Sequence, residues 1–233
     1  MTLKLYAALL FAAAASTAGA QIVITDPYEF SAGVSGGTTF SSVTFNPRVS
    51  QGTLAGLTFG LTGRMTMGEN VGLQLELNYA QQGWAEAYET APAYTYSRRL
   101  DYLQLPFLTH VQFGGKTVKG FINAGPHIGY MLSESTAEKR SEEMPGSIVT
   151  AQHEMSVENR LEWGIGGGAG IEIRTGAGYF LLEGRYTYSF GDIYGTKRKD
   201  YFSKASSQVI LAKITYLMPF RNTRSVRYGT QKR

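Results

Sequence analysis

Hydrophobic and polar residues alternate one by one along most of the chain. In VGLQLELNYA at residues 71–80, the odd positions carry large apolar side chains and the even positions carry small or polar ones. A period of two places successive side chains on opposite faces of an extended strand. The pattern predicts eight strands, at residues 28–36, 57–65, 71–80, 99–113, 120–132, 157–174, 180–189 and 210–220.

A glycine-rich stretch, EWGIGGGAGIEIR at residues 162–174, follows the same alternation. From Gly164 onward it has the G-x-G-x-x-A spacing of a loose dinucleotide-binding motif, which requires a helix directly after it. Residues 171–174 instead alternate again, and TGAG at 175–178 is typical of a turn. We therefore interpret the stretch as a strand whose inner face carries glycines that leave room for long side chains from other strands.

Strand and loop lengths indicate where the sheet resides. Several predicted strands exceed ten residues, whereas strands of globular proteins average about five or six and membrane-spanning strands need about nine to eleven. Short turns are expected at 66–70, 114–119 and 175–177, and long polar connections at 37–53, 84–98, 133–156 and 191–205. This asymmetry is typical of an eight-stranded antiparallel outer-membrane β-barrel with both termini in the periplasm.

The N-terminus has the pattern of a secretory signal peptide. Lys4 precedes an apolar run, and Ala18-Gly19-Ala20 forms a small-residue cleavage site. The alternative is a transmembrane anchor, but the run at 5–15 is shorter than the roughly 20 residues that a spanning helix needs. We expect a signal peptide at 1–20, a barrel at 21–220 and a tail at 221–233. The absence of cysteine excludes both disulfides and a lipid-modified N-terminal cysteine.

A soluble barrel such as a lipocalin is the alternative fold, because alternation alone does not say which face is buried. Two aromatic belts favour the membrane, since tyrosine, tryptophan and phenylalanine collect at membrane interfaces. The belt expected near the outer rim comprises Tyr79, Trp84, Tyr130, Trp163, Tyr186, Tyr188 and Phe190. The belt expected near the inner rim comprises Phe113, Phe121, Phe180, Tyr216 and Phe220.

If the apolar face meets lipid, charged residues on the other face must share a narrow lumen. The predicted network comprises Arg64, Glu76, Glu172, Glu183, Arg185 and Lys213, which are three acids and three bases. Nearer the outer mouth, the predicted lumen residues are Glu158, Arg160 and Glu162. An eight-stranded barrel is just wide enough for side chains to fill it, and unpaired buried charges are costly. We therefore expect a closed lumen with paired charges.

Enzymatic, metal and nucleic-acid functions find little support in the sequence. The three histidines, His110, His127 and His153, have no metal-ligand spacing and no evident serine or aspartate partners. A net charge of +4 is too small to indicate nucleic-acid binding. We expect no enzyme activity, no metal and no cofactor.

The outer loops and the tail are the candidate contact regions. The loop at 84–98 offers a plausible contact surface of Trp84, Tyr88, Tyr94 and Tyr96. The tail carries five basic residues: Arg221, Arg224, Arg227, Lys232 and Arg233. Because the tail has little to bury, it is expected either to attach to an acidic partner or to remain solvated.

The segment LDYLQLP at residues 100–106 resembles the Y-L-(E/Q)-(I/L)-P motif of PorT-like outer-membrane β-barrels, a family common in Bacteroidetes. Supporting segments are QQG at 81–83, GPHIG at 125–129, EGRY at 183–186 and GDI at 191–193. The resemblance implies an outer-membrane barrel, and the family's founding member takes part in type IX protein secretion and gliding.

Three functions follow as hypotheses. The first is a binding or assembly component of the outer membrane, in contact with lipid and with a periplasmic or outer-membrane protein. The alternative is a narrow passive channel for small solutes. The third is an outer-membrane lipid-modifying enzyme or protease.

Overall fold

The computed structural model describes residues 28–46, 51–87, 94–139, 153, 157, 159–194 and 204–220. The predicted signal peptide, the basic tail, Tyr88 and Glu158 lie outside the described residues. The strands are β1 (Glu29–Asn46), β2 (Gln51–Gly52), β3 (Leu54–Met67), β4 (Val71–Ala87), β5 (Thr95–Gly114), β6 (Val118–Lys139), β7 (Leu161–Thr175), β8 (Gly178–Ser189) and β9 (Lys204–Phe220).

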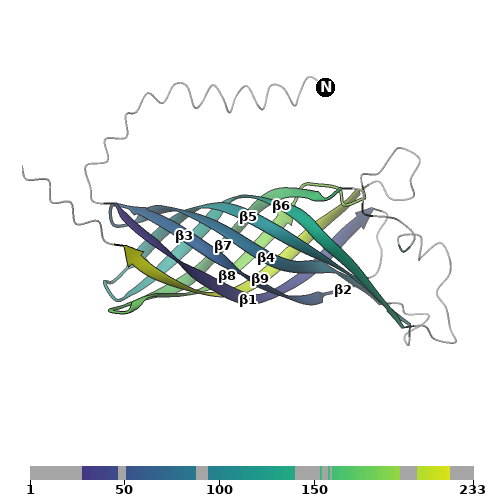
Figure 1. The fold of residues 1–233 in the computed structure, drawn as a ribbon, viewed down its shortest axis with the longest axis horizontal. Coiled ribbons are helices and arrows are strands. Elements are labelled where there is room, and N and C mark those ends of the chain that lie inside the picture. The colour runs from purple at the N-terminus through teal and green to yellow at the C-terminus, as the bar shows by residue number, and fades with distance from the viewer. Residues whose placement is uncertain are drawn as a thin grey trace, which may run out of the picture.

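The eight long strands close into an antiparallel barrel (Figure 1). Each pairs with its neighbour along the chain, and β1 pairs with β9 over seventeen positions, from Phe30 opposite Phe220 to Asn46 opposite Lys204. The short β2 adds two residues to the sheet beside the far end of β4. The predicted fold class, an all-β eight-stranded barrel, is confirmed.

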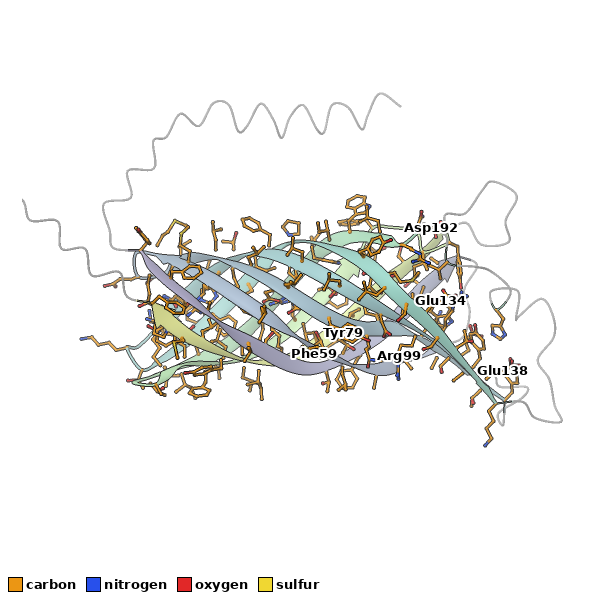
Figure 2. The ribbon with its side chains drawn as sticks, viewed as in Figure 1. Phe59, Tyr79, Arg99, Glu134, Glu138 and Asp192 are labelled. Atoms are coloured by element: carbon orange, nitrogen blue, oxygen red, sulfur yellow. The ribbon has the colours of Figure 1, made fainter. Side chains whose placement is uncertain are left out.

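The apolar face points outward and the polar face inward, as a membrane barrel requires. The outer wall shows exposed apolar side chains on every long strand (Figure 2), for example Val34, Leu57, Leu75, Leu105, Ile128, Ile165, Leu182 and Ile214. A soluble barrel would bury this face, so that alternative is wrong.

Several strands run further than the pattern predicted. The strand predicted at 28–36 extends to Asn46, and β4, β5 and β6 extend through much of the expected polar connections at 84–98 and 133–156. On β5, the outward side chains change from Leu103 to Asp101 and Arg99 as the strand leaves the apolar band. Both faces of these extensions are polar or mixed, so the contrast on which the prediction relied disappears there.

Two aromatic residues lie on the opposite side of the wall from the one predicted. Trp84 is fully buried inside the barrel, because it shares the even parity of Glu76 on the same strand. Phe121 is also buried inside, since the odd positions of β6 face the lumen. The other belt residues lie on the outer face, where Trp163 packs against Phe190 at 5.2 Å between ring centroids.

Candidate functional site: a lumen filled in layers

The lumen nearest the chain termini contains two joined clusters of ion pairs. In the first, Arg185 donates to both carboxylate oxygens of Glu76, at 2.9 and 2.7 Å, and Lys213 Nζ lies 2.7 Å from Glu76 Oε1. Glu183 accepts from Arg185 at 2.8 Å. These four residues come from β4, β8 and β9 and are almost completely buried. Each charge therefore has an opposite charge within hydrogen-bond reach, which offsets the cost of its burial.

The second cluster lies below the first, which means nearer to the chain termini. Arg64 of β3 donates to Glu172 of β7 at 2.5 Å, and Arg174 donates to the other carboxylate oxygen of Glu172 at 2.6 Å. The side chains of Arg64 and Glu172 are inaccessible to solvent. His110 lies 3.3 Å from Arg64 and 2.8 Å from Asn123 Oδ1, and Asn123 donates to Glu183 at 3.0 Å. Asn123 thus links both clusters across the lumen.

The structure brings all six residues of the predicted network together in these two clusters. Gln74 and Asn78, two neutral side chains beside Glu76, were not singled out from the sequence. Gln74 and Asn78 donate to the two oxygens of Glu76 at 2.7 and 2.8 Å. Their even positions on β4, which they share with Glu76, could have placed them in the lumen from the sequence.

Above the ion pairs lies a small cavity of about 20 Å³ with a mixed polar and apolar lining that includes His127, Arg185 and Pro106. His127 is buried, and neither ring nitrogen has a hydrogen-bond partner among the described residues. A cavity of this volume holds about one water molecule. The cavity is therefore much smaller than the space that a solute needs.

Of the residues predicted for the upper lumen, Glu162 lies inside the barrel and Arg160 does not. Glu162 is buried and accepts from Ser189, from Gln82 at 3.2 Å and from Gln104 at 3.4 Å. Arg160 is exposed just before β7, so its placement in the lumen was wrong. It precedes the strand, where alternation no longer specifies a direction.

An aromatic plug closes the mouth beyond Glu162. Its buried members are Val43, Trp84, Tyr94, Tyr96, Leu100, Tyr102, Met131, Ile193, Tyr194 and Ala205. Trp84 packs edge-on against Tyr194, and the Arg98 guanidinium lies 5.8 Å from the Trp84 ring centroid. Trp84, Tyr94 and Tyr96 were predicted to form a contact surface in an outer loop, which is wrong. They face inward from β4 and from the start of β5.

His153 is held at the outer edge of the plug. Its Nε2 lies 2.8 Å from Glu86, and its ring stacks on Tyr96 with 3.5 Å between centroids. Its Nδ1 lies 3.4 Å from the hydroxyl of Tyr94, which donates to Glu138 at 3.1 Å. Burial, followed by the hydrogen bond to Glu138, raises the pKa of Tyr94 to about 12. Tyr94 therefore stays neutral and acts as a hydrogen-bond donor.

Two buried hydroxyl groups of the upper barrel, those of Ser189 and Tyr94, donate to carboxylates. Ser189 donates to Glu162, and among the described residues no histidine shares that hydrogen bond. Tyr94 is next to a histidine and a carboxylate, but its raised pKa disfavours the nucleophilic phenolate. Among the described residues, no cluster of three or more histidine, aspartate or glutamate side chains has the arrangement of a metal site.

The sequence from residue 20 to 195 matches the family model described as outer membrane protein beta-barrel domain. The chain belongs to this family. The outer membrane protein beta-barrel domain accounts for the closed ring, the apolar outer wall and a location in the bacterial outer membrane. Within the described part of the chain, no helix has the length and apolarity to cross a membrane.

Solved outer-membrane barrels resemble this family member at low identity. Neisserial surface protein A is 12% identical, with a TM-score of 0.45, and the alignment covers 82% of this chain and 99% of that one. Ail of Yersinia pestis, solved with the heparin analogue sucrose octasulfate, is 13% identical, with a TM-score of 0.38 and the same two coverages. The outer membrane enzyme PagL is 13% identical, with a TM-score of 0.38, covering 80% of this chain and 99% of that one. No curated protein sequence matches the chain.

Proposed function

We propose that the protein is a non-conducting outer-membrane barrel that serves as a binding or assembly component. The observation that supports this role is the filling of the lumen at three successive levels. Two ion-pair clusters close its lower half and the aromatic plug closes its mouth. Because these layers fill the lumen of the described residues, contact with a protein partner falls to the parts of the chain outside the bilayer.

The alternatives are a narrow channel and an enzyme. A channel requires a continuous polar path, whereas the mid-lumen cavity has a volume of about 20 Å³ between filled layers. An enzyme requires a nucleophile and a base in contact. The hydroxyls of Ser189 and Tyr94 donate to carboxylates, which can act as bases, but the cavity beside Ser189 and Glu162 has a volume of only about 10 Å³, too small for a substrate. Our proposal therefore contains no transport or catalytic step.

The paired extension formed by the start of β5 and the end of β6 is the best candidate contact region. Residues 95–101 pair with 133–139 beyond the lipid-facing band, at the end of the barrel away from the termini (Figures 1 and 2). Ser133 to Lys139 are all exposed, as is Arg99 on the neighbouring strand. We propose this charged extension in place of the aromatic surface that the sequence suggested.

The assembly role extends to type IX protein secretion as the finer proposal. Its support is the resemblance of residues 100–106 to the PorT-like motif. In the structure these residues shape the barrel: Tyr102 is part of the plug, Gln104 binds Glu162, and Pro106 lines the cavity. The motif supports the fold directly and the secretion role only through family resemblance.

Affinity purification tests the binding role. The tagged protein, extracted from its native membranes in mild detergent, should retain a protein partner. Arg99→Glu combined with Lys139→Glu should reduce retention about tenfold, because charge reversal opposes an electrostatically complementary partner. Lys116→Glu, in the turn at the opposite end, is the matched control and should retain the partner. A chain truncated after Phe220 tests the basic tail separately. A partner that the truncated chain no longer retains binds through the tail. No partner with the wild-type chain would contradict the proposal.

The even strand number places both termini on the same side of the membrane, and the short turns on that side lead us to propose that it is the periplasm. This orientation has its own test. The chain lacks cysteine, so single cysteines are unique labels. Ser135→Cys, exposed on the paired extension of β5 and β6, should react with a membrane-impermeant maleimide on whole cells. Asn70→Cys, exposed in the β3–β4 turn, should react only after the outer membrane is permeabilised. The reverse labelling pattern would invert the barrel.

A further inference from the structure

The lipid-facing wall has a groove on its outer surface where two small residues lie side by side. Gly63 on β3 lies opposite Ala32 on β1, and its neighbour on β4 is Leu75. Large apolar side chains surround this position. They form a groove of about 510 Å³ whose lining includes Phe30, Leu61, Met65, Leu77, Leu105 and Phe107.

One side of the groove follows a break in the barrel's hydrogen-bond ladder. On β4 and β5, Leu75 pairs with Phe107 and Asn78 pairs with Gln104, but the two positions between them are unpaired. Pro106 occupies this interval, and proline has no N–H to donate to a neighbouring strand. The proline of the LDYLQLP segment therefore coincides with the place where the wall is concave toward lipid.

The groove is continuous with the apolar band, so hydrocarbon is the chemistry that fits it. Glu76 is the one charged residue in its lining, and its carboxylate turns inward to Arg185 and Lys213. Water is excluded at this depth. A void against the wall would lose the dispersion contacts that close packing supplies.

We propose that this groove is a binding site for one acyl chain of a glycerophospholipid. Phe30, near the start of β1, and Met65, near the end of β3, place the groove in the half of the wall nearest the termini. With the termini in the periplasm, as in the proposed orientation, that half lies in the inner leaflet of the outer membrane. Phospholipid therefore fits the site, rather than the lipopolysaccharide of the outer leaflet.

Gly63→Leu tests the site with little disturbance of the backbone. A Cβ at Gly63 would meet only the Phe30 ring edge, at 3.9 Å, so a larger side chain extends into the groove. Gly184→Leu is the matched control, because Gly184 is a lipid-facing glycine of β8 whose Cβ would meet nothing within 4 Å. Gly63→Ala is a milder second variant in case the leucine prevents folding.

The measurement is native mass spectrometry of each detergent-purified, folded protein titrated with phosphatidylethanolamine and, separately, with lipopolysaccharide. The wild type should retain one phosphatidylethanolamine. Gly63→Leu should weaken its retention about tenfold, or about 1.4 kcal/mol, and Gly63→Ala should weaken it less. Gly184→Leu should behave as the wild type.

Four results would overturn the site. They are undiminished retention in Gly63→Leu, equal loss in Gly184→Leu, preference for lipopolysaccharide, or a wild-type dimer that Gly63→Leu converts to monomer. The last result would identify a second copy of the chain as the occupant. None of these results depends on whether the barrel binds a protein partner.

Discussion

Replacing Glu76 with alanine should destabilise the folded barrel by on the order of 3 kcal/mol. Glu76 holds two cations at once, with Arg185 and Lys213 both 2.7 Å from its Oε1. Removing one partner of a buried ion pair leaves an uncompensated charge in a medium that solvates it poorly. Glu183 is 3.8 Å from Lys213 and already binds Arg185, so it compensates only in part. Urea unfolding of protein reconstituted in lipid vesicles, followed by tryptophan fluorescence, measures the loss.

Glu134→Ala is the matched control for this prediction. Glu134 pairs with Arg98 at 3.1 Å, but its side chain is 40% exposed at the outer rim. Arg98 is buried, but solvent reaches the pair through Glu134, so its loss should cost about 1 kcal/mol, less than the loss of Glu76. If both substitutions had the same small effect, the lower lumen would be hydrated and the proposed closed core would be wrong.

Replacing Trp84 with alanine should also cost about 3–5 kcal/mol, the range for large-to-small changes at buried aromatic residues. The ring is completely buried, its Nε1 donates to Glu86 at 2.8 Å, and Arg98 lies over its face. The second tryptophan, Trp163, is 53% exposed on the lipid-facing wall. Trp163→Ala should therefore cost less, and in each variant the remaining tryptophan reports unfolding. Equal costs would contradict the assignment of Trp84 to the plug.

Conductance gives the Trp84 variant a second measurement. In planar lipid bilayers, neither the wild type nor Trp84→Ala should show steady conductance of porin size. Loss of one plug residue leaves both ion-pair clusters in place below it, and Arg64, Glu172 and Arg185 still block the lumen. Steady conductance by the wild type would favour the narrow-channel alternative.

The sequence alone determined the class of fold and the direction of most side chains. Alternation is local: each strand residue faces the opposite side from its neighbour, whatever the strand's partners are. The parity of Glu76, Glu172 and Glu183 therefore placed them on the inner face before any pairing was known. The lengths of the strands and the asymmetry of the connections were sufficient to indicate a membrane barrel.

Only the tertiary structure determined which inner-face residues meet and where the lumen is closed. Glu76 and Lys213 are 137 residues apart in the chain, and their contact depends on the register of strands across the closed ring. Trp84 and Tyr96 looked like loop residues because β4 and β5 continue beyond the lipid, where the outer face is no longer apolar and the inner face mixes aromatic with charged residues. The groove at Gly63 likewise arises from residues of four strands, β1, β3, β4 and β5. Parity is a property of one strand, whereas plugs, ion-pair clusters and grooves are set by the packing of several strands together.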